Sequence, residues 1–132
     1  MDLHLAGKKV IVTGASKGIG FAIANEFSKE GASVSICARG SESLESAREL
    51  VAGNGGNVYA DICDVSDKKN LIRYIENAVQ NLGGLNILVN NPSGFGRSDD
   101  EDGWQAGIDI DLMALVRASW TAVPFIEKTG GG

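Results

Sequence analysis

The sequence contains few of the residues that mark secreted, metal-binding or membrane-spanning proteins. Its 132 residues include two cysteines, two prolines and one histidine. Two cysteines are too few to staple a secreted fold, and Cys37 and Cys63 lie in apolar stretches, so we predict buried thiols in a reducing, cytoplasmic environment. The apolar runs are short and the first residues lack the apolar core of a signal peptide, so we predict no membrane span and no secretory leader.

An excess of positive charge is also lacking. The formal net charge is −5 at pH 7, which argues against nucleic acid or an acidic membrane as the main partner. Acidic residues crowd the segment 98–103, whose sequence is SDDEDG. A metal site there would need a histidine or a second acidic cluster, and neither accompanies the segment. We therefore predict no metal and interpret the segment as the solvated start of a helix.

Short apolar stretches alternate with longer amphipathic ones along the chain. The short stretches are rich in β-branched residues and predict buried strands at residues 8–13, 32–39, 57–62 and 85–90. The longer stretches predict helices at residues 18–30, 41–53, 67–82 and 104–127. Ser41 is the expected amino-terminal cap of the second helix, and a polar loop is expected over residues 91–103.

This alternation determines the predicted fold class. Strands that are apolar throughout and separated by helices indicate a parallel sheet covered on both faces. Right-handed crossovers favour the strand order 3-2-1-4. The expected architecture is therefore α/β, a Rossmann-type doubly wound parallel sheet truncated after its fourth strand and fourth helix. We expect one dinucleotide-binding domain over residues 1–132.

A glycine-rich turn, VTGASKGIG at residues 12–20, joins the first predicted strand to the first helix. Gly14 permits backbone angles that a side chain would forbid, and the later glycines permit close approach of a ligand and of the helix to the strand. The free N–H groups and partial positive charge at the start of the helix suit a pyrophosphate. The dinucleotide contacts predicted from this turn are Gly14, Ser16, Lys17, Gly18, Ile19 and Gly20.

The spacing T-G-x-x-x-G-x-G over residues 13–20 resembles the short-chain dehydrogenase/reductase family. Asp64-Val65, after the third predicted strand, is similar to the family's contact with the adenine ring. NNPSG at residues 90–94 resembles its N-N-A-G motif, although Pro-Ser stands where Ala-Gly is usual. Within the family, the resemblance suggests a protein similar to 3-oxoacyl-carrier-protein reductases. The cofactor contacts that the resemblance adds are Asp64, Val65, Asn90, Asn91 and Ser93.

The end of the second predicted strand bears on the choice of nucleotide. Dinucleotide folds that prefer NAD carry a carboxylate there, which bonds the ribose 2′-hydroxyl. This sequence has Arg39 instead, and Lys17 in the glycine turn adds a second positive charge. Both cations suit a 2′-phosphate, which predicts NADP(H) over NAD(H). The alternative is that both are ordinary surface cations.

The family's reaction needs a Tyr-x-x-x-Lys motif and a serine, and the sequence lacks the motif. Neither Tyr59 nor Tyr74 is followed by lysine four residues later. The resemblance therefore implies the amino-terminal portion of a short-chain dehydrogenase/reductase, which we expect to be inactive by itself. Asp111 stands where the family has a catalytic asparagine. It is either a member of the catalytic group or an ordinary helix residue near the cofactor.

Two functions fit these observations. One is an NADP(H)-dependent carbonyl reductase or alcohol dehydrogenase with a small-molecule substrate, represented by its cofactor-binding half. The other is a non-catalytic dinucleotide-binding or dimerisation module. The last predicted helix, over residues 104–127, has a wider apolar surface than one sheet face needs, which predicts contact with a second copy or with the missing carboxyl-terminal half. An uncovered fourth strand would leave the isolated chain weakly stable or oligomeric.

Overall fold

The computed structural model describes residues 1–94 and 98–130. Strands and helices alternate along the chain as the hydrophobic pattern predicts, and the fold class is confirmed. The elements in chain order are β1 (Lys9–Val12), α1 (Gly18–Lys29), β2 (Ser33–Ala38), α2 (Ser41–Ala52), β3 (Val58–Ile62), α3 (Lys68–Leu82), β4 (Ile87–Val89), α4 (Glu101–Ala106), η1 (Gly107–Met113) and α5 (Ala114–Glu127).

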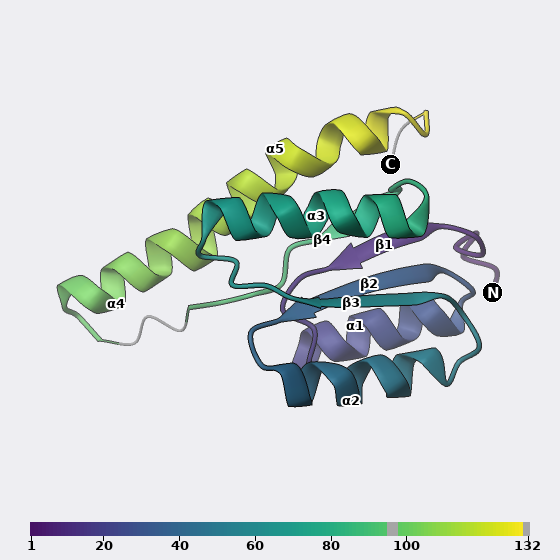
Figure 1. Cartoon of the computed structure of the whole chain (residues 1–132), viewed down its shortest axis with the longest axis horizontal. Helices are drawn as coiled ribbons and strands as arrows, with labels where there is room; N and C mark the ends of the chain where they lie inside the picture. The colour runs from purple at the N-terminus through teal and green to yellow at the C-terminus, as the bar shows by residue number, and fades with distance from the viewer. Residues whose placement is uncertain (95–97, 131–132) are drawn as a thin grey trace.

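The described residues form a four-stranded sheet in the order β3-β2-β1-β4. Its three strand pairs are parallel, and β1 is central, with Val10 opposite Val34 of β2 on one side and Ile87 of β4 on the other. The predicted order 3-2-1-4 is therefore confirmed. In Figure 1, α1 and α2 lie on one face of the sheet, and α3 and α5 lie on the other.

Each face of the sheet has its own hydrophobic core, because successive side chains of a strand point to opposite faces. Val10 and Val12 of β1 pack toward α1 and α2, while Ile11 between them packs toward α3 and α5. All three are completely buried. Because the sheet is buried on both faces, the strands are largely apolar in the sequence.

The helix ends differ in how well the sequence predicts them. Asp67 caps α3, where its carboxylate accepts from the Asn70 N–H at 3.0 Å, and Gly83 closes the helix at φ 79°. For α2 the expected cap was wrong. Gly40 holds the cap position with an extended backbone, and Ser41 is already the first helical residue. The chain enters this helix one residue earlier than the serine suggests.

The last helical stretch also begins earlier than predicted. It starts at Glu101 rather than Trp104, because the Asp100 carboxylate accepts from the Gly103 N–H at 2.7 Å and caps α4. The π-helical segment η1 then joins α4 to α5 without a break in the helical path. In Figure 1 this stretch runs alongside α3, and α4 projects beyond the sheet. Residues 95–97 of the predicted loop lie outside the described residues.

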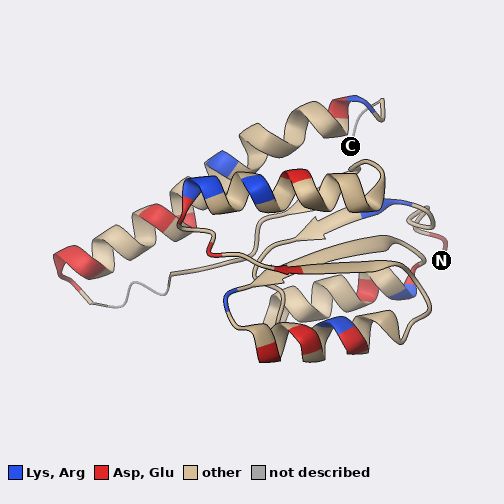
Figure 2. Cartoon of the chain, viewed as in Figure 1, with Lys and Arg blue, Asp and Glu red and all other residues tan. Residues whose placement is uncertain are grey.

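The projecting end of this stretch is acidic. Within the described segment 98–113, every charged side chain is a carboxylate, as the red positions on α4 and η1 in Figure 2 indicate. Cations return only at Arg117 in α5. Within residues 1–94 and 98–130, no helix has the length and hydrophobicity to cross a bilayer.

Candidate functional site

The carboxyl ends of the four strands meet at one edge of the sheet, because all the strands are parallel. The residues predicted to contact a cofactor all belong to the segments that directly follow these ends. The glycine turn follows β1, Arg39 follows β2, Asp64 follows β3 and Asn90 follows β4. The topology therefore brings to one edge the features that the sequence offers separately.

The glycines of the turn serve different structural needs. Gly14 and Gly18 have φ values of +65° and +63°, a region that side chains strongly disfavour. A Cβ added at Gly14 would also lie 3.1 Å from the Pro92 Cβ, whereas one added at Gly18 would meet no atom within 4 Å. Gly20 needs its small size, since a Cβ there would collide with the Gly14 carbonyl oxygen and the Asn91 side chain. The open space at Gly18 leaves a cradle for a ligand at the start of α1.

The first turn of α1 is available to an anion. Lys17 precedes the helix in an extended conformation, and no side chain in the described part of the chain caps the helix. Uncapped N–H groups at a helix start, together with the helix dipole, favour a phosphate there. Lys17, Gly18 and Ile19 are exposed, so a ligand can approach them from solvent, and Ser16 is half-buried beside them.

The asparagines after β4 support the glycine turn. The Asn91 side-chain amide donates to the Gly14 carbonyl at 2.8 Å, and its backbone N–H donates to the Thr13 hydroxyl at 3.4 Å. The Asn90 side chain donates to the Ser119 hydroxyl of α5 at 3.4 Å. Thr13 and Ser119 were not among the predicted site residues, because their roles depend on contacts between distant parts of the chain. Asn91 thus fixes the shape of the turn from the neighbouring strand.

Asp64 and Arg39 lie close enough to interact electrostatically. Asp64 accepts hydrogen bonds from the Ser66 N–H at 3.0 Å and the Ser66 hydroxyl at 2.7 Å. These bonds lower the pKa of the Asp64 carboxyl, and the positive charge of Arg39 lowers it further. Among the described residues neither Arg39 nor Lys17 belongs to an ion pair, and both are exposed. Val65, the next predicted contact, is buried in the core.

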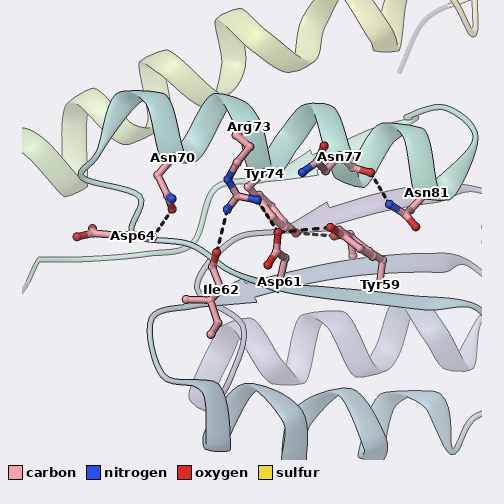
Figure 3. A network of polar contacts seen from close by, with 10 residues as sticks. Tyr59, Asp61, Ile62, Asp64, Asn70, Arg73, Tyr74, Asn77 and Asn81 are labelled. Atoms are coloured by element: carbon pink, nitrogen blue, oxygen red, sulfur yellow. Dashed lines mark hydrogen bonds and ion pairs between the residues drawn. The ribbon is translucent and has the colours of Figure 1, made fainter.

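A polar network holds the end of β3 against α3 (Figure 3). The Arg73 guanidinium donates to the Asp61 carboxylate at 2.8 Å and to the Ile62 carbonyl at 3.2 Å. On the segment that follows, the Asp64 N–H donates to the Asn70 side chain at 3.0 Å. The network therefore fixes the direction in which the chain leaves β3, and with it the position of Asp64.

The two tyrosines have surroundings that do not suit proton transfer. Tyr74 is completely buried, and its hydroxyl lies 2.5 Å from the Ser35 hydroxyl. Burial raises the pKa of Tyr74 well above its ordinary value. Burial and the neighbouring Asp61 carboxylate also raise the pKa of Tyr59, whose hydroxyl donates to that carboxylate at 3.4 Å. A catalytic phenol needs its pKa lowered toward neutrality, so neither tyrosine fits that role.

Asp111 of η1 reaches the loop that follows β4. Its carboxylate accepts from the Gly94 N–H at 2.9 Å, and a Cβ added at Gly94 would lie 2.6 Å from the Ala106 carbonyl oxygen. Loop and helix are therefore packed closely here, whereas Ser93 is exposed. Asp111 also lines a small cleft together with Thr13, Asn90 and Pro92. The π-helical turn that carries Asp111 has no clear signal in the sequence.

Comparison with known proteins decides the family. The sequence model described as short chain dehydrogenase matches residues 8–132. The chain belongs to the short chain dehydrogenase family. The structure agrees with this assignment. It superposes on the L-sorbose reductase of Gluconobacter frateurii, which was solved with NADPH and L-sorbose, with a TM-score of 0.93 and 34% sequence identity. The match covers 100% of this chain and 52% of that chain.

Other members of the short chain dehydrogenase family show the same extent of overlap. Human "Dehydrogenase/reductase SDR family member 4" is 35% identical over 133 residues, which cover 97% of this chain and 48% of the relative. NAD⁺-bound xylitol dehydrogenase shares the fold, with a TM-score of 0.90 at 22% identity, over 97% of this chain and 51% of that chain. The chain thus spans about half the length of the curated relatives that it matches.

Across residues 1–94 and 98–130, no three or more histidine, cysteine or acidic side chains are grouped in a way that could hold a metal ion. Uncapped N–H groups, an open glycine and exposed cations lie at the edge where the strands end.

Proposed function

We propose that this chain is the cofactor-binding portion of an NADP(H)-dependent oxidoreductase that interconverts a carbonyl compound and an alcohol. The observation that carries the cofactor assignment is Arg39. It stands directly after β2, is exposed, and forms no ion pair with a carboxylate among the described residues. A guanidinium at this position pairs with the 2′-phosphate of NADP(H), where an acidic residue would instead bond the free hydroxyl of NAD(H).

The fold alone does not choose between the two cofactors. One solved structure of this fold holds NADPH and another holds NAD⁺. The choice therefore depends on side chains at the ends of the strands, and here Arg39 and Lys17 supply two positive charges. Phosphate recognition by such exposed cations is electrostatic, so it weakens as salt concentration rises.

In the proposed complex each segment of the site has its own task. The uncapped N–H groups of α1 bind the pyrophosphate, and the open space at Gly18 admits it. Asp64 contacts the adenine ring, and Asn91 keeps the Gly14 carbonyl in place. NADP(H), when bound, supplies or accepts a hydride. The residues of this chain bind and orient the dinucleotide for that step.

The proton that accompanies the hydride needs a group with a suitable pKa. Tyr59 and Tyr74 do not provide one, because both pKa values are raised. Asp111 is occupied by the Gly94 N–H and, in this proposal, positions the loop after β4 instead of exchanging a proton. Reaction in the family manner would therefore need a Ser and a Tyr-x-x-x-Lys from outside these 132 residues. The alternative, a non-catalytic dinucleotide-binding module, would bind NADPH without any such partner.

The cofactor assignment is tested by reversing one charge. Arg39→Asp is expected to weaken NADPH binding by about thirtyfold, the equivalent of about 2 kcal/mol for a charge-assisted pair, and to leave NADH binding unchanged or tighter. Nicotinamide fluorescence titrations give both dissociation constants. Arg48→Asp is the matched control, because Arg48 is paired with Glu45 on α2. An unchanged NADPH-to-NADH affinity ratio in Arg39→Asp would refute the assignment.

The last helical stretch supports a second part of the proposal, contact with another copy of the chain. Trp104 is 66% exposed and Trp120 is 70% exposed, and four further apolar side chains on this stretch are also exposed: Ile108, Leu112, Leu115 and Val123. Large exposed apolar surfaces of this kind mark interfaces. Sedimentation velocity of the wild type and Trp120→Lys tests the contact, since a charge placed on this apolar surface should dissociate an oligomer. Location in the cytoplasm and likeness to 3-oxoacyl-carrier-protein reductases stay predictions from the sequence.

A further inference from the structure

Two free cysteines meet at the ends of neighbouring strands. Cys37 lies in β2 and Cys63 directly follows β3. Cys37 is opposite Asp61 in the parallel register, and the Cys63 N–H donates to the Ala38 carbonyl at 3.0 Å. Residues two positions apart along a strand share a face, so both side chains point into the core between the sheet and α3. Their exposed fractions are 0% and 1%.

The surroundings of the two thiols differ. The neighbouring Cys63 thiol, the Gly14 backbone and the Tyr74 hydroxyl lower the pKa of Cys37, while the Cys37 thiol and burial raise the pKa of Cys63. Cys37 is therefore the partner that more readily forms a thiolate, and Cys63 is the one that retains its proton.

Cys37 also contacts the glycine turn directly. Its carbonyl oxygen accepts from the Ala15 N–H at 3.0 Å. We propose that Cys37 and Cys63 are a modification site, at which a hydroperoxide converts the two thiols into a disulfide and so shifts the glycine turn out of its dinucleotide-binding geometry. The effect on dinucleotide affinity rests on the function proposed above, whereas formation of the disulfide does not.

The reaction balances with one molecule of hydrogen peroxide. The Cys37 thiolate attacks one peroxide oxygen, the O–O bond breaks, and the departing hydroxide takes a proton to form water, which leaves Cys37 as a sulfenic acid. The Cys63 sulfur then attacks the Cys37 sulfur. The S–O bond breaks and the second oxygen leaves as water with the Cys63 proton. Two thiols are oxidised to one disulfide, and the peroxide is reduced to two molecules of water.

Access to the buried pair requires local opening. β3 is an edge strand, its last residue Ile62 is 48% exposed, and Asp64 is exposed on the other side of Cys63. Fraying of this strand end opens the core at Cys63 and at Cys37 on the neighbouring strand, while the pairing of β2 with β1 is kept. A dinucleotide held by Asp64 and the glycine turn opposes this opening. Oxidation is thus expected to be slow in the free chain and slower in the complex.

Peptide mapping tests the disulfide. The chain is treated with hydrogen peroxide, alkylated and digested with trypsin without reduction. Cleavage after Lys29, Arg39, Arg48 and Lys68 places the cysteines in separate peptides, 30–39 and 49–68. We expect these two peptides to be joined and lighter by two hydrogen atoms, within a single chain. The proposal would be overturned by a cross-link between two chains. It would also be overturned if both peptides were found free and alkylated although the oxidation of surface methionines shows that the peroxide had reacted with the protein.

Two single substitutions serve as matched controls. Cys63→Ala removes the resolving thiol, so Cys37 should stop at a sulfenic acid that dimedone traps. Cys37→Ala should leave Cys63 unmodified, because burial still raises the pKa of the Cys63 thiol after the contribution of Cys37 is gone. Trapping at Cys63 in preference to Cys37 would refute the assigned roles. Both variants are first compared with the wild type by circular dichroism, and mapping of the wild type provides the answer if either fails to fold.

The link to the dinucleotide is measured separately. NADP⁺ is used, because the oxidised cofactor does not consume peroxide, and its binding is confirmed by equilibrium dialysis. We expect bound NADP⁺ to slow cross-linking several-fold, and the isolated disulfide form to bind NADP⁺ several-fold more weakly until it is reduced. Bound NADP⁺ with unchanged oxidation and unchanged affinity would refute the link. If NADP⁺ does not bind at all, the proposed function fails while the disulfide result still stands on its own.

Discussion

Alanine substitutions at Gly18 and Gly20 should have very different effects on stability, although both glycines belong to the same motif. At Gly18 an added methyl meets no atom within 4 Å, so the change costs only the strain of the left-handed backbone, about 1–2 kcal/mol. Part of that cost is offset, because alanine restricts the unfolded chain by about 0.4–1 kcal/mol relative to glycine. The expected net loss at Gly18 is about 1 kcal/mol.

At Gly20 the backbone is unstrained and the cost is steric. A methyl there would collide with the Gly14 carbonyl oxygen and the Asn91 amide, which form a hydrogen bond of 2.8 Å with one another. Overpacking costs about 1–3 kcal/mol and loss of the hydrogen bond about 1 kcal/mol, against a gain in helix propensity of at most about 1 kcal/mol. We expect a net loss of about 2–3 kcal/mol.

Urea unfolding measures both variants. With a slope of about 2 kcal/mol per molar for a small protein, the midpoint should fall by about 0.5 M for Gly18→Ala and by more than about 1 M for Gly20→Ala. Both variants should lose dinucleotide binding, the first through the lost cradle and the second through distortion of the turn. Equal midpoints, or a larger loss at Gly18, would show that the turn does not have the packing described here.

Three further predictions concern the polar contacts. Tyr74→Phe should lower the free energy of urea unfolding by about 2 kcal/mol, because it leaves the buried Ser35 hydroxyl unpaired. Adding Ser35→Ala should recover most of this loss, and a double variant whose loss equals the sum of the two single losses would contradict this reasoning. The pKa of Asp64 is lowered in the folded protein, so this carboxylate stabilises the fold above its unfolded pKa of about 3.9, and the stabilisation is lost as pH falls through the folded pKa. Ser66→Ala removes a hydrogen bond that lowers this pKa, so the midpoint of urea unfolding should depend less steeply on pH in that acidic range. Asp111→Asn should keep the contact with the Gly94 N–H and leave the melting temperature nearly unchanged, whereas Asp111→Ala should lower stability by about 1 kcal/mol, which calorimetry would detect.

The sheet could be predicted because its determinants are local. Each strand is a short run of β-branched residues, and each helix places its apolar residues on one face, so the element order and the parallel sheet follow directly. The glycine turn was recognisable for the same reason, since its spacing lies within residues 13–20 and its strand and helix flank it. Right-handed crossovers then led to the observed strand order.

The errors arose where short-range signals compete. Ser41 has a strong preference for a cap position, but Gly40 already supplies the extended residue, so the serine lies inside the helix. Asp100 begins α4 in a segment whose acids and glycine also suit a loop. The π-helical turn of η1 has no compositional signal, and its contact from Asp111 to the Gly94 N–H joins it to the loop after β4.

Within the candidate site, the sequence indicated residues that the strand ends bring to one edge, but not what each of them contacts in the protein. Asn91 stays a predicted cofactor contact, and its amide also holds the Gly14 carbonyl. That contact joins residues 77 positions apart, so no local pattern could reveal it. The electrostatic influence of Arg39 on Asp64 also crosses between two strand ends. The cofactor preference itself remains a prediction that the substitution at Arg39 tests.

The bond between Asn91 and Gly14 has a consequence for how the site comes into being. Closing so long a loop is entropically costly, so contacts of this kind form late in folding. A nascent chain that has emerged only as far as β3 already carries the complete glycine motif and the Ala15 contact with Cys37, yet the Asn91 amide that holds the Gly14 carbonyl is still missing. Binding competence should therefore arise only after β4 has left the ribosome and paired with β1. Until that moment the motif is present in the chain, and the site is not.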